Sequence, residues 1–342
     1  MNKLVALIFV CLVASCANAP VSQDQQKTID SSVIAGTGIE ILDAEALNLI
    51  DTTAKIEKLG EGYEWSEGPL YIPDGDYLLF SDVPMNKVYK WKEGEGVKLY
   101  LDSSGYVGRD VPKKEPGSNG LLLDKNGNLV LCQHGLRRVA RMDAPLSAPK
   151  AAYTSIVDNY KGKKLNSPND AVFNSKGDLY FTDPPYGLVK GNDDSLKEQP
   201  HHGVYLVREN GKAELVTGEL NYPNGIALTP DEKFLIVAHS DPDNMVWMKY
   251  ELDAKGLIKN KSVFYKISEE EKKLPGSPDG FKINKSGYVF ASAPGGVWVF
   301  NPSGKPIAKI YTGQATSNCA FSADQHAIYM TCEAFLYRLK LK

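Results

Sequence analysis

The sequence has no excess of positive charge. Its 39 lysines and arginines stand against 42 aspartates and glutamates, giving a net charge of −3, and the basic residues are spread along the chain. Nucleic-acid-binding domains usually carry a basic stripe, or an RNA-type motif in which aromatic and basic residues alternate, and neither occurs here. The sequence therefore predicts no nucleic-acid partner.

Motifs of two common enzyme classes are also missing. No Gly-x-Ser-x-Gly elbow is present, and no glycine-rich loop follows a strand-like run and opens a helix-like one. Residues 294–296 (PGG) lie between two strand-like runs and are interpreted as a turn. Neither a nucleophilic serine elbow nor a dinucleotide site is predicted.

The apolar run at the start of the chain, LVALIFVCLVA, is too short to cross a bilayer but has the shape of a signal peptide. Residues 13–16 (VASC) resemble a lipobox, so we predict a lipoprotein signal peptide over residues 1–15 and a lipid anchor on Cys16. The alternative is an ordinary secretory signal cut near Ala19. Ala17 follows the cysteine, which in Gram-negative bacteria resembles sorting to the outer membrane. The predicted location is the bacterial cell envelope, on the periplasmic face of that membrane.

Cysteine is scarce, with five residues in the chain. Cys11 would leave with the signal peptide, so Cys132, Cys319 and Cys332 remain besides Cys16. An exported protein can form disulfides, and Cys319 and Cys332 lie at opposite ends of one predicted hairpin. The favoured interpretation is that all three are small buried hydrophobic residues, with that disulfide as the alternative.

Long helical patterns are few, and short β-type runs separated by glycine and proline turns dominate, which indicates an all-β fold. Residues 167–183 (SPNDAVFNSKGDLYFTD) show the repeating unit: a polar pair, an apolar run, a glycine turn and a second apolar run, typical of a hairpin. The unit begins at positions 67, 119, 169, 224, 279 and 318. Spacings of roughly 40 to 55 residues match propeller blades.

Two further strand-like runs follow each of the first five hairpins, which gives the four strands of a propeller blade. The sixth unit is one strand short, whereas residues 54–59 form a spare strand before the first unit. Pairing 54–59 with residues 335–341 would close the ring and cover an edge. We therefore predict a six-bladed β-propeller over residues 51–342, after a tether and short N-terminal segment over residues 16–50 in which Asp43 caps a short helix.

The first residue of every unit bears a carboxylate or an amide. Inner strands of a propeller run along its axis, so these residues should form a ring: Glu67, Asn119, Asn169, Asn224, Asp279 and Asn318. Oxygen donors without cysteine or histidine favour a hard divalent cation over zinc. The alternative is that these residues only start tight turns, as asparagine, aspartate and glycine often do. Glutamate is a weak turn former, yet Glu67 occupies the equivalent position of the first unit, which favours the cation site.

Four motifs occur in order: WSEGP at 65–69, NSPND at 166–170, YPNG at 222–225 and SPDG at 277–280. They resemble the senescence marker protein/gluconolactonase/luciferin-regenerating family over about residues 50–342, and TDPPYG at 182–187 resembles its bacterial gluconolactonase branch. The resemblance implies a six-bladed propeller with one divalent cation on its axis. Ca²⁺ is the expected ion, and Mg²⁺, Mn²⁺ and Zn²⁺ are the alternatives. Its ligands would be Glu67, Asn169, Asn224 and Asp279.

The resemblance further implies metal-dependent hydrolysis of a small-molecule sugar lactone, with Asp279 as the general base. A cation-bound carboxylate is a weak base, so His134 is the alternative, because histidine titrates near neutrality. The side chains expected to contact substrate are Asn119, His134, Asn169, Tyr186 and His239. The animal branch has an arginine where this chain has Ser167, so its substrate preference is not carried over.

Two other functions stay open for the same site. One is a broader esterase or phosphotriesterase, and the other is a non-enzymatic binding propeller of the envelope whose cation only stiffens the axis. Two long polar loops, residues 105–118 and 186–202, are expected to cover the mouth of the propeller. The predicted oligomeric state is a monomer.

Overall fold

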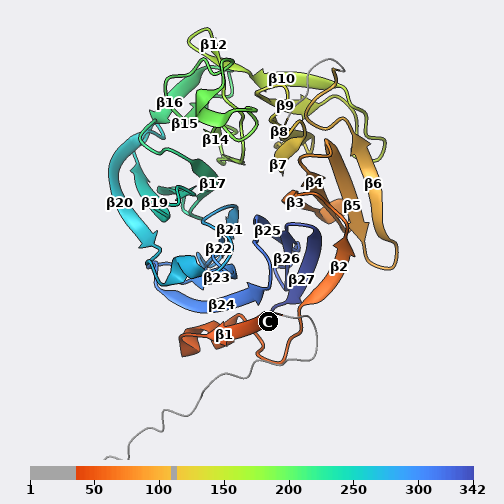
Figure 1. The fold of residues 1–342 in the computed structure, drawn as a ribbon, viewed down its shortest axis with the longest axis vertical. Helices are drawn as coiled ribbons and strands as arrows, with labels where there is room; N and C mark the ends of the chain where they lie inside the picture. Colours follow the sequence, from red (N-terminus) through yellow and green to blue (C-terminus); the bar gives the residue numbers. More distant parts are fainter. Residues whose placement is uncertain (1–35, 109–113) are drawn as a thin grey trace, which may run out of the picture.

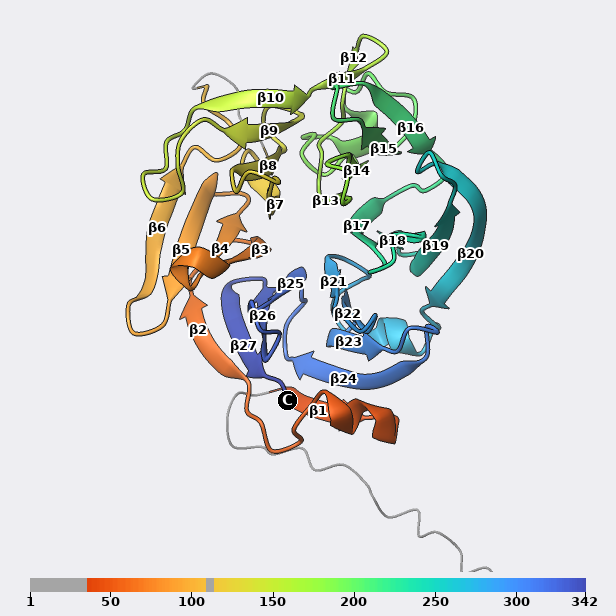
Figure 2. The ribbon, with the colours of Figure 1, turned by 180° about the vertical axis from the view of Figure 1, so that it is seen from behind.

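Short antiparallel strands follow one another along the chain in a computed structural model that describes residues 36–108 and 114–342. Six sheets stand around a central axis like the blades of a propeller (Figure 1), and the view from behind shows the same ring (Figure 2). Within each blade the first strand lies innermost and the last lies at the rim. The predicted all-β, six-bladed fold is confirmed.

The first three blades follow the predicted order of four strands each. Their strands are β3 (Ser66–Ile72), β4 (Tyr77–Asp82), β5 (Lys87–Lys92) and β6 (Gly96–Asp102); β7 (Ser118–Leu123), β8 (Leu129–Gln133), β9 (Arg138–Met142) and β10 (Tyr153–Val157); and β13 (Ala171–Phe173), β14 (Leu179–Asp183), β15 (Gly203–Val207) and β16 (Ala213–Thr217). A small hairpin, β11 (Asn159–Tyr160) with β12 (Lys163–Lys164), connects the second blade to the third.

The last three blades repeat the pattern, with one strand of each of the last two taken from the start of the described chain. Their strands are β17 (Pro223–Leu228), β18 (Phe234–His239), β19 (Val246–Leu252) and β20 (Ile258–Lys266); β21 (Phe281–Ile283), β22 (Val289–Ala293), β23 (Gly296–Phe300), β24 (Pro306–Thr312) and β1 (Thr37–Ile41); and β25 (Asn318–Phe321), β26 (Ala327–Cys332), β27 (Phe335–Lys340) and β2 (Glu57–Glu61). The 3₁₀ helices are η1 (Ala44–Asn48), η2 (Pro73–Gly75), η3 (Gly191–Asp193) and η4 (Glu271–Lys273).

The hairpin turns between inner strands follow from the sequence. In the second blade, the Asp124 carboxylate accepts the backbone N–H groups of Asn126 (2.8 Å) and Asn128 (2.9 Å), and Gly127 adopts a φ of +77°. A side-chain acceptor at the first turn position and a glycine that tolerates positive φ are what such a turn requires. Asn174 and Asn284 accept the equivalent bonds in the third and fifth blades.

Strand β2 closes the ring as predicted. It pairs with β27, placing Lys58 opposite Tyr337, and the Arg338 guanidinium binds the Glu57 carboxylate. The strand begins three residues later than predicted, and Ile56 instead packs in the core between the fifth and sixth blades. Hydrogen bonds between the two ends of the chain thus complete the last blade and cover its edge.

Strand β1 was not predicted, because residues 16–50 were assigned to a tether and a short segment. It pairs with β24 as a fifth strand of the fifth blade, with Ile39 opposite Ile310. The predicted cap is confirmed: the Asp43 carboxylate accepts the Glu45 N–H at 2.9 Å at the start of η1. Ala46 is fully buried there, so the segment from residue 37 packs against the propeller.

The cores lie between neighbouring blades and are filled by alternate strand residues. Cys132, Cys319 and Cys332 are buried in these cores and free, which confirms the favoured interpretation over the disulfide. Cys319 pairs with Met330 and Cys332 with Phe335, so the two cysteines are not directly opposite each other in the hairpin. Among the described residues, no helix has the length and apolar character needed to cross a membrane.

Candidate cation site at the propeller axis

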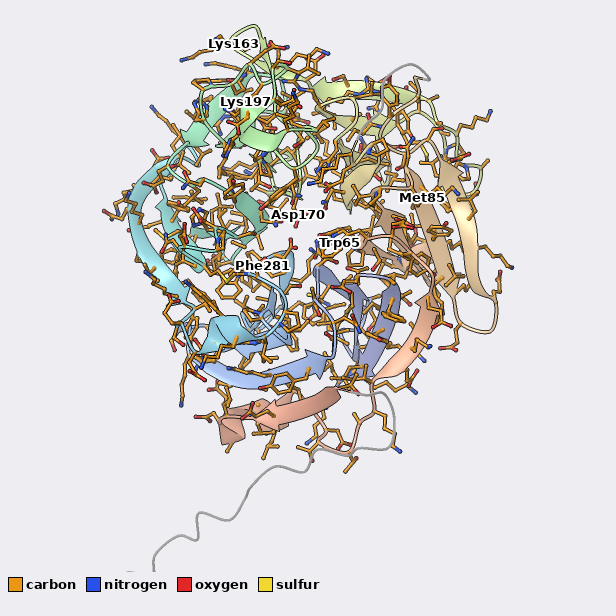
Figure 3. The ribbon with its side chains drawn as sticks, viewed as in Figure 1. Trp65, Met85, Lys163, Asp170, Lys197 and Phe281 are labelled. Atoms are coloured by element: carbon orange, nitrogen blue, oxygen red, sulfur yellow. The ribbon has the colours of Figure 1, made fainter. Side chains whose placement is uncertain are left out.

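The predicted ring residues all lie where the innermost strands start. Glu67, Asn119 and Asn224 lie near the starts of β3, β7 and β17, and the bulge of each strand begins at Glu67 or includes the asparagine. Bulges re-aim side chains and recur next to functional sites. With sticks drawn, side chains crowd the inner ends of the blades around the axis (Figure 3).

Glycines after the ring residues let the inner strands approach one another. A Cβ added at Gly225 would lie 2.3 Å from the carbonyl oxygen of Asp279, and one at Gly280 would lie 1.9 Å from Cγ of Asn318. A larger residue at either position would push apart neighbouring blades at the axis. The Asn-Gly and Asp-Gly pairs therefore bring the polar side chains together, a role beyond starting a turn.

Amide oxygens around the axis lack partners. The side-chain oxygens of Asn119, Asn169 and Asn224 are buried and accept no hydrogen bond from the described residues. The Asn224 amide nitrogen donates to Ser240 Oγ at 3.0 Å, which in turn donates to the carbonyl of Pro278. This chain of bonds fixes the orientation of the Asn224 amide and leaves its oxygen free for a ligand. A buried acceptor without a donor is costly, so it points to a group that binds there.

Two ring carboxylates share the same site. Glu67 is 1% exposed, and its Oε2 accepts the N–H of Gly68 at 2.5 Å and the Asn318 amide at 3.2 Å. Burial raises the pKa of Glu67 to about 7. Burial, and then the charge of Glu67, raise the pKa of Asp279 well above its usual range. Two crowded carboxylates beside free amide oxygens fit a hard cation such as Ca²⁺.

The donor set differs from a zinc site. In the described part of the chain, no three side chains among histidine, cysteine, aspartate and glutamate come together so that they could hold a metal ion. The proposed ligands are two carboxylates, Glu67 and Asp279, and two amide oxygens, Asn169 and Asn224. Calcium accepts amide oxygens readily, whereas zinc prefers nitrogen and sulfur.

Asn318 departs from the expectation that all six ring residues offer oxygen to the axis. Its amide nitrogen faces Glu67, while its oxygen accepts from Lys282 Nζ at 3.2 Å and from the N–H of Cys319 at 2.8 Å. A cationic donor therefore sets the orientation of this amide. Lys282 was not among the predicted site residues, although a lysine stands out in the short inner strand FKI.

The two predicted histidines are both buried. His239 accepts the N–H of Asn221 at Nε2 (3.1 Å), and its Nδ1 lies 2.9 Å from the carbonyl of Asn244, so both ring nitrogens have backbone partners. This favours a role in holding loops over the predicted substrate contact. His134 is fully buried, and its Nδ1 lies 3.2 Å from Glu115 Oε2.

Tyr186 lies beside the ring, as a substrate contact should. Burial raises the pKa of its hydroxyl, with the charge of Asp279 adding to the effect and hydrogen bonds from Ser240 and Asn224 opposing it. The Tyr186 ring stacks on Tyr222, with centroids 5.9 Å apart and planes at 15°. This aromatic pair joins the loop after β14 to the residue that directly precedes β17.

Two aspartates of the third blade were overlooked as parts of the site. Asp183 is fully buried and accepts the N–H groups of Asn166 and Ser167, each at 2.8 Å, which holds the loop in front of Asn169. Burial raises the pKa of Asp183 to about 7. Asp170 is 4% exposed and directly follows Asn169. Comparing the residue after each ring position would have found Asp170, because most units have glycine there.

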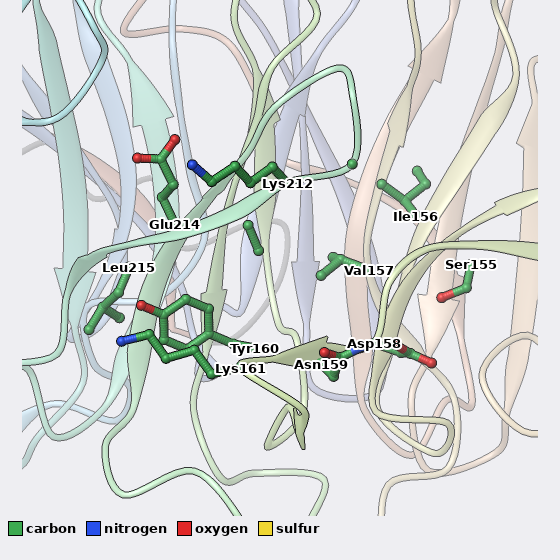
Figure 4. Close-up of a pocket in the computed structure, with 12 residues that line it drawn as sticks. Ser155, Ile156, Val157, Asp158, Asn159, Tyr160, Lys161, Lys212, Glu214 and Leu215 are labelled. Atoms are coloured by element: carbon green, nitrogen blue, oxygen red, sulfur yellow. Dashed lines mark hydrogen bonds between the residues drawn. The ribbon is translucent and has the colours of Figure 1, made fainter.

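A wide groove lies elsewhere, at the rim (Figure 4). It has a volume of about 680 Å³ and runs between β10 and β16, lined by residues such as Asp158, Lys161, Lys212 and Glu214. It contains none of the ring residues and none of the buried polar atoms without partners. The chemistry therefore concentrates at the axis.

The chain is similar to known proteins along most of its length. Residues 65–334 match the SMP-30/Gluconolactonase/LRE-like region. A gluconolactonase of Zymomonas mobilis is 37% identical over 302 residues, covering 86% of this chain and 83% of its own. The structure of a Xanthomonas campestris gluconolactonase superposes with a TM-score of 0.76 at 29% identity, over 89% of this chain and 95% of the other. A calcium-binding regucalcin of Agrobacterium tumefaciens, at 16% identity and a TM-score of 0.63 over 84% of this chain and 95% of the other, shares the fold.

Proposed function

Because the chain belongs to the SMP-30/gluconolactonase/LRE-like family, we propose that it hydrolyses a sugar lactone at the propeller axis with the help of one divalent cation. The resemblance to gluconolactonases supports a lactonase. The observation that carries the cation is a set of free, buried amide oxygens around the buried Glu67 carboxylate and the partly exposed Asp279 carboxylate. Such a set of oxygen donors fits a hard cation.

Each ring residue has a task in this proposal. Glu67, Asn169, Asn224 and Asp279 would hold the cation, which when bound polarises the lactone carbonyl and stabilises the negative charge that develops on it. Asp279 Oδ1 accepts the N–H of Gly280 at 2.9 Å. Its other oxygen would take the proton of the attacking water.

Polar side chains beside the ring would orient the substrate. Tyr186 offers a hydroxyl and the free oxygen of Asn119 offers an acceptor, so both suit the hydroxyl groups of a sugar acid lactone. His134 stays the alternative base. His134 is fully buried directly after β8, whereas Asp279 is partly exposed. A water on the axis would therefore transfer its proton more readily to Asp279 than to His134.

Calcium is the preferred cation on the chemistry of the donors, and the regucalcin of Agrobacterium tumefaciens is described as calcium-binding. Amide and carboxylate oxygens in a flexible ring suit its variable coordination number. Mg²⁺, Mn²⁺ and Zn²⁺ are the alternatives. Calcium acidifies bound water less than zinc does, but a lactone is an activated ester and needs less help.

Lactone hydrolysis with and without a chelator tests the proposal. We expect turnover of glucono-lactone by the purified protein, its loss in excess chelator, and its recovery when a divalent cation is added back. Far-ultraviolet circular dichroism should show that the fold persists in chelator. Turnover that is indifferent to chelator would remove the cation from the reaction, and no turnover of any lactone would favour a binding propeller.

We further propose that the protein is attached to the envelope membrane through Cys16, which lies outside the described residues. The support is the lipobox-like sequence VASC at 13–16. Replacing Cys16 with serine should move the protein from the membrane pellet to the soluble fraction, because the acylation site is lost. An unchanged distribution in a fractionation of the producing cells would contradict the anchor.

A further inference from the structure

Two residues of opposite charge that were not among the predicted site residues lie beside the ring, Asp170 and Lys282. The residue after the ring position is glycine in four of the six units and cysteine in the last, but it is Asp170 in the third. Asp170 lies near the centre of the ring of blades (Figure 3), and its Oδ1 accepts the N–H of Ala171 at 2.9 Å. Its Oδ2 is buried and has no hydrogen-bond partner among the described residues. Asp170 is thus a third carboxylate near the axis.

The opposite charge comes from the fifth blade. Lys282 is the third residue after Asp279, and the other five units have apolar residues at that place, namely Leu70, Leu122, Val172, Ala227 and Phe321. Lys282 Nζ donates to the carbonyl of Phe281 and to the side-chain oxygen of Asn318, both at 3.2 Å. Burial raises the pKa values of Glu67 and Asp170, and the positive charge of Lys282 opposes this rise.

Asn318 links the lysine to the ring. Its oxygen faces Lys282, so its amide nitrogen must face Glu67, and that nitrogen donates to Glu67 Oε2 at 3.2 Å. The Asn318 amide also opposes the effect of burial on the pKa of Asp170. Gly280 makes room for the amide, since a Cβ there would lie 1.9 Å from Asn318 Cγ. One cationic side chain therefore orients a donor toward the Glu67 carboxylate.

Three carboxylates, Glu67, Asp170 and Asp279, bring three negative charges to the axis, and Lys282 brings one positive charge. The remaining two negative charges match one divalent cation. We propose that Lys282 is the internal counter-ion of Asp170 and Glu67, and that it limits the axis to a single divalent cation while holding Asn318 as a donor. This inference rests on the proposed cation, but it does not depend on which lactone is hydrolysed.

Replacing Lys282 with methionine, which keeps the length and removes the charge, tests the proposal on the full-length protein. In chelator, the Lys282→Met variant should melt roughly 5 °C lower, because a buried charged cluster has lost one partner. By equilibrium dialysis with Ca²⁺, it should bind a second ion or bind the first about tenfold more tightly, since a repelling charge is gone. Lys282→Arg should retain one site and the wild-type melting temperature, as should the control Lys285→Met, because Lys285 is an exposed turn residue.

A double variant separates charge from packing. If Lys282 acts as a counter-ion, adding Asp170→Asn to Lys282→Met should restore both the melting temperature and the single site. A Lys282→Met protein that matches wild type in chelator and in stoichiometry overturns the proposal, as does a destabilised one that Asp170→Asn fails to rescue. A wild-type protein that binds no divalent cation would contradict the proposed cation. If the melting results still followed the expectation, the role of Lys282 as a counter-ion would be retained.

Discussion

Replacing Asp279 with asparagine should lower lactone turnover at saturating cation by about 100-fold or more, the usual scale of a positioned general base. The amide keeps an oxygen for the cation but can no longer accept a proton, and it removes one negative charge from the ring. Cation affinity should therefore fall as well. Measuring affinity by titration, and turnover at a cation concentration that saturates the variant, separates the two losses.

The companion variant is His134→Gln, which leaves all four proposed ligands in place. Burial of His134 leads us to expect that it retains cation binding and most of the activity. The reverse pattern would reassign the base: a fully active Asp279→Asn enzyme with its cation restored, together with a His134→Gln enzyme that binds cation but is about 100-fold slower.

Removing the cation should make the stability of the protein depend steeply on pH. The pKa of Glu67 is about 7 in the folded protein without cation, above its ordinary value of 4.5. The folded state therefore holds a proton that the unfolded state has released between these pH values, and stability falls as pH rises through that window. The loss should be on the order of 3 kcal/mol, from 1.36 kcal/mol per pKa unit. Asp279, whose pKa is also raised, shifts in the same direction.

Urea unfolding in chelator at pH values from about 4.5 to 7.5 measures this slope. Glu67→Gln should reduce this slope without removing it, because Asp183 and Asp279 also have raised pKa values in the folded protein, whereas Glu61→Gln, at an exposed position of β2, should leave it unchanged. Saturating Ca²⁺ should stabilise the wild-type protein most at neutral pH, where the carboxylates are ionised. A stability that is level across the window in chelator, or that rises with pH equally in wild type and Glu67→Gln, would contradict the buried-carboxylate account.

Repetition made the propeller and the ring predictable. Six units with the same polar start and the same hairpin leave few other arrangements, and the shortage of one strand at the end pointed to closure by the strand that became β2. The ring residues could be named because each unit places its first side chain in an equivalent position. The sequence could not show how each amide is oriented. Asn318 and Asn224 are the same residue type, yet Asn318 donates its nitrogen to Glu67, whereas Asn224 donates its nitrogen to Ser240 and leaves its oxygen free.

The overlooked features depend on contacts between units. Strand β1 has a short, weakly alternating sequence, TGIEI, and becomes a strand because β24 presents a free edge. Lys282 matters through its contact with the neighbouring blade, at Asn318. His239 looked like a candidate substrate contact from its place in the repeat, but backbone groups of the surrounding loops occupy both of its nitrogens. Such partners come from loops that carry no repeat.

Closure of the ring by β2 has a consequence for how the chain reaches its native state. The bonds between Glu57 and Arg338 join residues 281 positions apart in sequence, so the last blade can form only after synthesis of nearly the whole chain. Until then β2 is an unpaired strand on a nascent protein. Unpaired strand edges can pair with other chains and aggregate. Contacts so distant along the chain also predict slow folding. Loss of β27 would therefore leave β2 without its partner and open the ring instead of fraying one terminus.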